Sequence, residues 1–249
     1  MDKQIAKRLL KEFKRISEKG YIKGIYNCSS SIGRTFENEL NLPRNEFSVP
    51  DYYGIEIKTR RTYSKSRITL FNAVPDGEDL FEIERLKDMY GYPYKKDKKY
   101  KALYADVYGN KLTFGGVIYQ YKLDVNREEE KIYLLVYDRK GKLKERKIYW
   151  SFQYLESKIA NKLQNLAIIN AWTNSVDGWN YFKYYKIKFY TYKGFDLFLK
   201  LLEEGIIRVT LRIDIHLDEK RYGHTYDHGC GFGILEKDIT KLYEEYKFD

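Results

Sequence analysis

Two carboxylates and a lysine lie close together in residues 49–61, which read V-P-D-Y-Y-G-I-E-I-K-T-R-R. Asp51 precedes a tyrosine-rich turn, and beyond the turn apolar and polar residues alternate as in a half-buried strand, so Glu56 and Lys58 share one face. Converging carboxylates bind Mg²⁺ through hard oxygen atoms, and a neighbouring lysine can orient or deprotonate a water and neutralise charge on a phosphate. The pattern D-x(n)-E-x-K therefore predicts the chemistry of a metal-dependent nuclease.

Residues on either side of this segment support the same chemistry. Glu37, in G-R-T-F-E-N-E-L, is expected to add a third carboxylate from a helix. Residues 59–67 are basic and rich in hydroxyl groups, as in a segment that faces phosphates, so Arg60 and Arg61 are predicted to bind DNA. The competing interpretation is a solvated strand face, because opposite charges often alternate there and short motifs are only hypotheses.

Length and composition are those of a globular chain. The 249 residues can bury a substantial core, and a hydrophobic content of 43% argues against disorder. No apolar run approaches the ~18 residues that span a bilayer, and the first ten residues lack the apolar region of a secretory signal. Cys28 and Cys230 have no metal-site spacing, and a reducing cytoplasm is the simpler inference.

The chain is basic, with 46 Lys and Arg against 36 Asp and Glu and a formal net charge of +10. Such an excess attracts a polyanion, and nucleic acid is the leading candidate. The 26 tyrosines fit this view, since their rings pack while their hydroxyls reach phosphates or bases. An AT-rich genome also enriches Lys and Tyr, so composition alone does not decide.

Apolar periodicity predicts several elements around the D-x(n)-E-x-K segment. Helical spacing predicts helices over residues 3–19 and 33–40. Residues 67–71, R-I-T-L-F, are expected to form a strand, with residues 62–66 as the turn of a hairpin that places this strand beside the E-x-K residues.

The second half of the chain also mixes helical and strand patterns. A helix is predicted to begin at Ser151, and the apolar residues 164–172 are expected to form a central strand. Residues 181–192 alternate aromatic residues with lysines, and residues 206–216 form a long alternating strand. A terminal helix is predicted over residues 236–246.

These elements predict a mixed α+β fold with a central sheet flanked by helices. No internal repeat or low-complexity linker divides the chain. We expect two lobes of one compact fold, a catalytic lobe over residues 1–101 and a DNA-recognition lobe over residues 102–249. Two such lobes would suit a clamp around a DNA duplex.

A second polar group spans residues 208–228, which contain all three histidines. Arginine recognises the guanine edge, aspartate accepts a hydrogen bond from cytosine, and histidine can do either, while a two-stranded ribbon fits the major groove. Alternatives are a zinc site at His224 and His228 with Asp227, or solvated loop charges such as Arg221. The residues predicted here to bind DNA are Arg208, Arg212, Asp214, Tyr226, Asp227 and His228.

Five segments resemble the MvaI/BcnI family of type II restriction endonucleases, which are related in their catalytic core to the repair nicking enzyme MutH. The segments occur in the family's order along nearly the whole chain. They are S-I-G-R-T-F-E-N-E-L from Ser31, P-D-Y-Y-G-I-E-I-K-T from Pro50, I-T-L-F from Ile68, Y-W-S-F from Tyr149 and T-Y-D-H-G from Thr225.

The resemblance implies a PD-(D/E)xK fold and Mg²⁺-dependent hydrolysis of phosphodiester bonds in double-stranded DNA. It implies Asp51 and Glu56 as metal ligands, Lys58 as the residue that orients or activates the attacking water, and Glu37 as a supporting glutamate, as in the MutH branch. It also implies a monomer that acts on short pseudo-palindromes of the C-C-N-G-G type, in a cell with a cognate DNA methyltransferase.

The D-H-G of residues 227–229 is closer to the MvaI branch of the family than to the BcnI branch. BcnI-like proteins have histidines where this chain has Asn72, which we assign to DNA binding, and Gly231. That departure favours an A:T central pair, hence a C-C-W-G-G-like site. Two alternatives stay open, a MutH-like strand-nicking enzyme and a DNA-binding module with a silent catalytic site.

Overall fold

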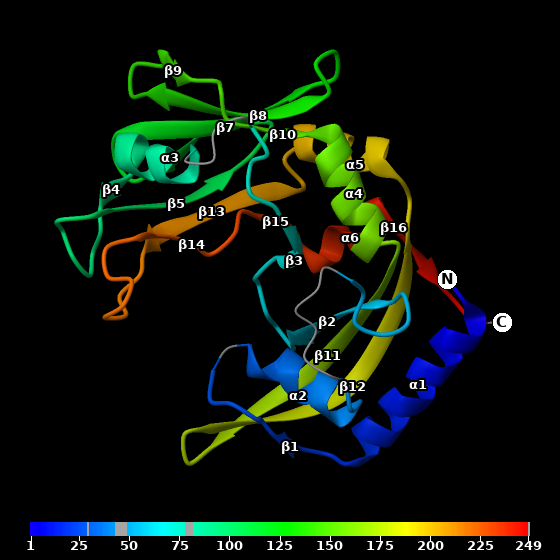
Figure 1. Ribbon diagram of the computed structural model, residues 1–249. Helices are drawn as coiled ribbons and strands as arrows, with labels where there is room; N and C mark the ends of the chain where they lie inside the picture. The colour runs from blue at the N-terminus through cyan, green and yellow to red at the C-terminus, as the bar shows by residue number, and fades with distance from the viewer. Residues whose placement is uncertain (29, 43–48, 78–81, 249) are drawn as a thin grey trace. The chain divides into compact units, whose positions relative to one another are not determined.

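The computed structural model describes residues 1–28, 30–42, 49–77 and 82–248 (Figure 1). Helices and strands are mixed, which confirms the predicted α+β class. The chain forms two compact units, and each is assembled from separated stretches. Unit 1 comprises Met1–Ser66, Lys158–Lys193 and Thr240–Asp249, and unit 2 comprises Arg67–Ser157 and Gly194–Ile239. The sequence-based division at residue 101 assigns catalysis to one lobe and DNA recognition to the other, and that assignment stays a prediction.

Unit 1 contains a five-stranded sheet in the order β1-β12-β11-β2, with β16 also paired to β12. β11 lies between β12 and β2, so the predicted central strand is confirmed. β2 runs parallel to β11, with Glu56 opposite Leu166 and Lys58 opposite Ile168. The strands of this sheet are β1 (Ile22–Lys23), β2 (Glu56–Arg61), β11 (Asn165–Val176), β12 (Trp179–Tyr192) and β16 (Tyr243–Tyr246).

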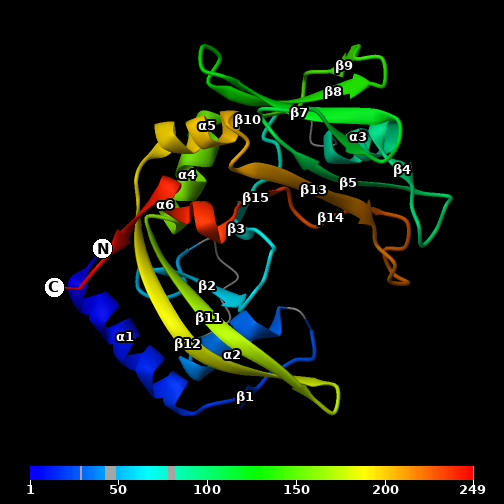
Figure 2. The same ribbon diagram turned by 180° about the vertical axis from the view of Figure 1, so that it is seen from behind.

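Helices α1 (Lys3–Glu18) and α2 (Ser31–Glu39) pack on the sheet of unit 1, in agreement with the two predicted helices (Figure 2). α1 begins where the Asp2 carboxylate caps two backbone N–H groups, and its buried stripe includes Leu9 and Phe13. Phe36 of α2 extends this core. The odd-numbered residues of β2 face the helices, which leaves Glu56 and Lys58 on the opposite face.

Unit 2 contains two sheets, one in the order β3-β15-β13-β5-β4 with β14 beside β13, and one in the order β10-β8-β7-β6 with β9 beside β8. The strands of the first are β3 (Ile68–Asn72), β4 (Tyr92–Pro93), β5 (Lys101–Val107), β13 (Arg208–Ile215), β14 (Thr225–Asp227) and β15 (Gly231–Ile234). Those of the second are β6 (Thr113–Gly115), β7 (Tyr119–Asn126), β8 (Lys131–Asp138), β9 (Leu143–Glu145) and β10 (Tyr149–Ser151).

The remaining helices are α3 (Glu82–Tyr90), α4 (Phe152–Lys162), α5 (Phe195–Glu203), the 3₁₀ turn η1 (Glu236–Asp238) and α6 (Ile239–Leu242). The boundary between the units at Ser157 and Lys158 falls inside α4. In the described part of the chain, none of these helices has the length and apolar character to cross a membrane.

Two predicted elements are wrong. β3 does not form a hairpin with β2, because β3 pairs with β15 in unit 2 while β2 pairs with β11. The terminal helix ends at Leu242, and the chain continues as β16, which pairs with β12. There the sheet satisfies the backbone of β16 and buries Tyr243 completely, which outweighs the local helical pattern.

Candidate active site and DNA-reading face

A tight turn places Asp51 beside the start of β2. Tyr52 and Ile55 exchange two backbone hydrogen bonds of 2.9 Å, and the residues between them, Tyr53 and Gly54, have φ of 44° and 88°. Positive φ at both central positions is the geometry of a two-residue type I′ turn. The Asp51 carboxylate accepts a hydrogen bond of 2.9 Å from the backbone N–H of Ile57. The turn therefore folds Asp51 back onto the strand that carries Glu56.

Glu56 is only 1% exposed and lies between two lysines. Its Oε1 is 2.6 Å from Lys58 Nζ and 3.5 Å from Lys162 Nζ. Its Oε2 is buried and has no hydrogen-bond partner among the described residues. Burial raises the pKa of Glu56 to about 7, and the charge of Asp51 adds to this rise while Lys58 and Lys162 oppose it.

The unpartnered Glu56 oxygen fits a metal ion, because a buried carboxylate oxygen without a donor is costly unless a cation meets it. Asp51 would supply a second hard oxygen donor. Glu37 does not join them in a three-carboxylate group: its side chain pairs with Arg34 at 3.2 Å, and the described residues contain no group of three His, Cys, Asp or Glu suited to a metal ion. The predicted role of Glu37 stays a prediction.

Lys162 is a site residue that the sequence analysis missed. It is the last residue of α4, about 100 positions beyond Glu56 in the chain. No motif surrounds it, and only the parallel pairing of β11 with β2, which starts at Leu166 and Glu56, explains its approach. The expectation of a central strand at residues 164–172 was the one available signal.

Arg212, Asn72 and His228 come together in unit 2. The Arg212 guanidinium donates to the Asn72 side-chain oxygen at 3.3 Å and to the backbone carbonyls of His228 and Gly229 at 3.2 Å. Gly231 lies against the same group, since a Cβ there would be 3.2 Å from the Asn72 oxygen. Three strands that are distant in sequence thus assemble one polar surface.

Asp214 lies beneath this surface and is only 4% exposed. It accepts hydrogen bonds from the hydroxyls of Tyr94, at 2.9 Å, and Tyr104, and its other oxygen is 3.0 Å from His228 Nε2. Burial alone would raise the pKa of Asp214, but the bonds from Tyr104, Tyr94 and His228 outweigh it and lower that pKa. The sequence analysis did not anticipate these two tyrosines.

Asp227 and Tyr226 belong to the same group. Asp227 accepts a hydrogen bond of 2.8 Å from the backbone N–H of Gly229, and burial raises the pKa of its carboxyl group. The ring of Tyr226 lies between His216 and His228, with ring centroids 4.3 and 4.1 Å away. The zinc alternative does not form, since the described residues contain no group of three or more His, Cys, Asp or Glu side chains that could hold a metal ion.

The other predicted DNA-binding arginines are engaged elsewhere. Arg208 pairs with Asp106 at 2.6 Å and with the Tyr108 hydroxyl at 3.0 Å. Arg60 is 7% exposed and donates to the carbonyl of Ser64 at 2.8 Å, so it holds the turn after β2. Arg61 lies over the ring of Phe182, with its guanidinium carbon 5.8 Å from the ring centroid.

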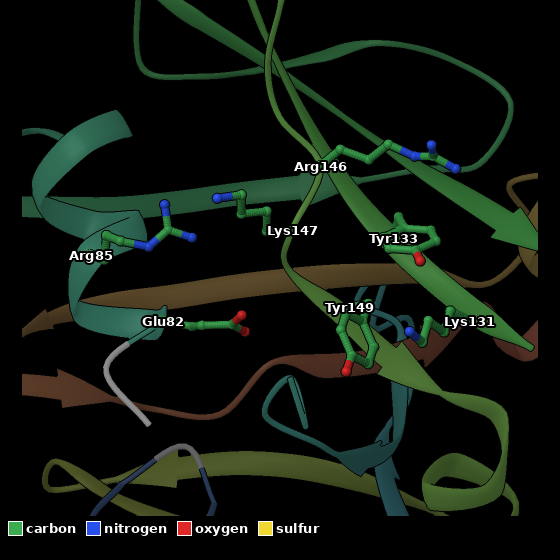
Figure 3. A pocket seen from close by; sticks show the side chains of 7 residues that line it. All are labelled: Glu82, Arg85, Lys131, Tyr133, Arg146, Lys147 and Tyr149. Atoms are coloured by element: carbon green, nitrogen blue, oxygen red, sulfur yellow. The ribbon is translucent and has the colours of Figure 1, made fainter. Parts of the chain in front are cut away.

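A separate basic pocket of unit 2 contains none of the predicted site residues (Figure 3). Two of its cations are neutralised, Arg85 by Glu145 at 2.6 Å and Arg146 by Glu129 at 3.3 Å. Its lining residues are Glu82, Arg85, Lys131, Tyr133, Arg146, Lys147 and Tyr149. Lys131 and Lys147 leave the lining basic, and the pocket is not part of the predicted site.

Comparison with known proteins decides the family. The family model described as the MvaI/BcnI restriction endonuclease family matches residues 10–243. The chain belongs to the MvaI/BcnI family. Its members are restriction endonucleases, so this protein is a type II site-specific deoxyribonuclease, and such enzymes are generally metal-dependent.

Two solved structures agree with this assignment. The complex of restriction endonuclease MvaI with its cognate DNA substrate matches with a TM-score of 0.90 and 27% identity, over 99% of this chain and 98% of that one. MvaI in the absence of DNA matches with a TM-score of 0.65, at the same identity and coverage. A search of curated proteins finds no match.

Proposed function

We propose that this endonuclease uses Mg²⁺ to hydrolyse double-stranded DNA at a C-C-W-G-G-like site and that it acts as a monomer. The observation that carries the proposal is the buried Glu56 carboxylate, which has one oxygen on Lys58 and the other unpartnered, and whose pKa is raised in part by the charge of Asp51. Two hard oxygen donors beside a lysine are the donor set of a magnesium-dependent phosphodiesterase.

The proposed mechanism assigns a task to each residue. Asp51 and Glu56 hold the magnesium ion, which when bound supplies Lewis-acid stabilisation of the charge on the scissile phosphate. The N–H of Ile57 fixes the Asp51 carboxylate. Lys58, as the cation paired with Glu56, orients the attacking water for in-line displacement and neutralises charge that develops on the phosphate, while Lys162 helps to hold the Glu56 carboxylate in place.

The proposed reading of DNA centres on Arg212. Its guanidinium presents several donors, a geometry suited to guanine, and Asn72 and the carbonyl of Gly229 hold it in place. Asp214 has little free acceptor capacity, so it contributes by holding His228. A base contact from His228 and the neighbouring Asp227 and Tyr226 completes this proposal.

The test is digestion of a sequenced, unmethylated plasmid with the purified protein, with and without Mg²⁺, followed by sequencing of the ends. We expect discrete Mg²⁺-dependent fragments that end within one short motif, and none with Asp51→Asn. Accumulation of nicked circles without linear product would favour the MutH-like alternative. Cleavage in the absence of any divalent metal would contradict the mechanism.

A restriction enzyme endangers the DNA of its own cell. We therefore propose a cognate DNA methyltransferase that modifies the same site in the cytoplasm without forming a stable complex with the endonuclease. Methylation of the plasmid at the site found above should abolish cleavage.

A further inference from the structure

Three exposed aromatic residues of unit 1 form a continuous array at the end of β2. The ring of Tyr63 lies edge-on to Trp172 with centroids 5.5 Å apart, and Trp172 stacks on Tyr185 at 5.2 Å. Their exposed fractions are 85% for Tyr63, 37% for Trp172 and 39% for Tyr185. We call these three residues the aromatic platform. Contiguous exposed apolar surface of this kind marks an interaction site.

The platform is continuous with the strand that carries the catalytic residues. Thr62 extends the pairing of β2 with β11, since its N–H and its hydroxyl both donate to the carbonyl of Ala171, at 2.9 and 3.1 Å. The Thr62 hydroxyl also reaches the Tyr185 hydroxyl at 3.2 Å. The register places Trp172 level with Thr62 and on the same sheet face as Lys58. Along the strand direction, Trp172 lies four residues beyond the level of Lys58, which is about 13 Å at ~3.3 Å per residue.

Tyr63 is held in an unfavourable conformation. Its φ is 65°, a region that bulky side chains rarely adopt and that Gly or Asn adopts more easily. With 85% of its surface exposed, the ring gains little from packing, so the fold does not account for a tyrosine at this position. A strained and exposed residue beside a catalytic strand indicates a functional contact.

The charge around the platform matches a polyanion. Lys65, Lys183 and Lys186 are exposed, and none of the three forms an ion pair with a described residue. Lys183 lies opposite Trp172 in the β11–β12 ladder, and Lys186 follows Tyr185 directly. Phosphates satisfy such lysines, while the sugars of the DNA backbone offer apolar surface to the rings.

We infer that the aromatic platform is a DNA-contact surface of the catalytic unit, on which Tyr63 and Trp172 pack against the sugars of the duplex backbone while the three lysines meet its phosphates. The inference rests on the proposed function only in taking DNA as the partner. Because such contacts are independent of sequence and of metal, they are measurable on any duplex.

The first experiment measures binding of the full-length protein to a fluorescein-labelled 30-base-pair duplex of random sequence in EDTA. Tyr63→Gly should bind roughly tenfold more weakly, the lower range of one aromatic stacking contact. Its unfolding temperature should equal or exceed that of the wild type, since glycine relieves the positive φ. Tyr63→Phe should recover binding relative to Tyr63→Gly, and Tyr21→Ala, another exposed tyrosine of unit 1, should bind as the wild type does.

The second experiment uses the fluorescence of Trp172. The other two tryptophans, Trp150, which is fully buried, and the half-buried Trp179, also emit, so comparison with Trp172→Phe assigns the response to Trp172. Addition of the same duplex should quench or shift the emission, and Trp172→Phe should remove that response. The inference would be overturned if Tyr63→Gly bound the duplex as tightly as the wild type, or if the tryptophan emission did not change when the duplex was added. A fall in unfolding temperature that parallels the loss of binding would also overturn it. A concentration-dependent dimer that Tyr63→Gly abolishes would assign the surface to a second copy of the chain instead of DNA. A plasmid left uncut with Mg²⁺ would count against the proposed function alone, since neither binding experiment requires cleavage.

Discussion

The proposed catalytic centre and the proposed DNA-reading face are built in opposite ways. Asp51, Glu56 and Lys58 lie within eight consecutive residues, and Lys162 joins them from the end of α4. The reading face combines Asn72 of β3 and Arg212 of β13 with the turn after β14. The chemistry of the reaction is thus encoded locally, whereas specificity depends on the pairing of distant strands.

The two sites also use their buried carboxylates differently. Glu56 keeps one oxygen without a donor, and burial raises its pKa to about 7. Asp214 is surrounded by donors that lower its pKa against the effect of burial. In the proposed function, the first carboxylate binds a cation, and the second is a fixed acceptor that orients His228. The predictions below test this contrast.

The largest effect is expected at Lys58. Lys58→Ala should reduce cleavage about 10³-fold, the scale of a lost electrostatic contribution, while DNA binding stays largely intact. Single-turnover cleavage and a gel-shift assay on the same duplex measure the two quantities. Lys7→Ala, an exposed lysine of α1, serves as the control. A loss of binding as large as the loss of cleavage would remove the distinction between catalytic and reading residues.

Arg212 and Arg208 are a matched pair on β13. Arg212→Ala should weaken binding to the cognate site by ~1–3 kcal/mol, the value of one base contact, with a smaller loss on random DNA. Arg208→Ala should change specificity less, because Asp106 and Tyr108 already engage its guanidinium. Competition binding with cognate and random duplexes measures both. Equal losses of Arg212→Ala on the two duplexes would make Arg212 a phosphate contact.

Lys162 tests whether the catalytic centre is complete within residues 51–58. Lys162→Met should lower cleavage about tenfold and raise the Mg²⁺ concentration at half-maximal rate, because Glu56 then loses one of its two cations. Lys162→Arg should restore most of the rate. Isothermal titration with Mg²⁺ gives a readout independent of cleavage. An unchanged dependence of the rate on Mg²⁺ concentration would show that Lys162 does not contribute and that the catalytic centre consists of residues 51–58 alone.

The smallest effect concerns stability and pH. The pKa of Glu56 rises from 4.5 to about 7 on folding, so between these values the folded protein retains a proton that the unfolded chain releases. Stability is therefore lost as the pH rises through this window. In EDTA, Glu56→Gln should unfold at a higher temperature than the wild type at pH 8 and show little advantage at pH 5, while Glu18→Gln should show no such trend. A pH-independent difference would contradict the raised pKa.

Local sequence patterns predicted the parts of the fold that local interactions determine. The strand that places Glu56 and Lys58 on one face and the apolar stripe of α1 are confirmed, because the sheet face and the helix stripe each repeat within a few residues. β2 is not half-buried as predicted, since Glu56 and Arg60 on its second face are also buried. The predicted hairpin of β2 with β3 failed because adjacency in sequence does not determine pairing, and β3 finds its partner β15 about 160 residues away.

Tertiary contacts explain what the sequence could not show. β5 received no prediction because residues 101–107 pair with β13, whose sequence lies far downstream. Tyr94 and Tyr104 lie among 26 tyrosines, and nothing in the local pattern marks these two as donors to Asp214. A buried acid that needs donors is the physical signal, and it becomes visible only once burial is known.

The interleaving of the two units constrains how specificity can be exchanged between relatives. Unit 2 consists of Arg67–Ser157 and Gly194–Ile239, so a chimeric enzyme with a foreign recognition unit requires two grafted segments and four splice points. Two of these points fall within α4 and α6, where a graft must replace the whole helix to keep its hydrogen bonds. A protein engineer cannot obtain either unit by truncating the chain at a single position.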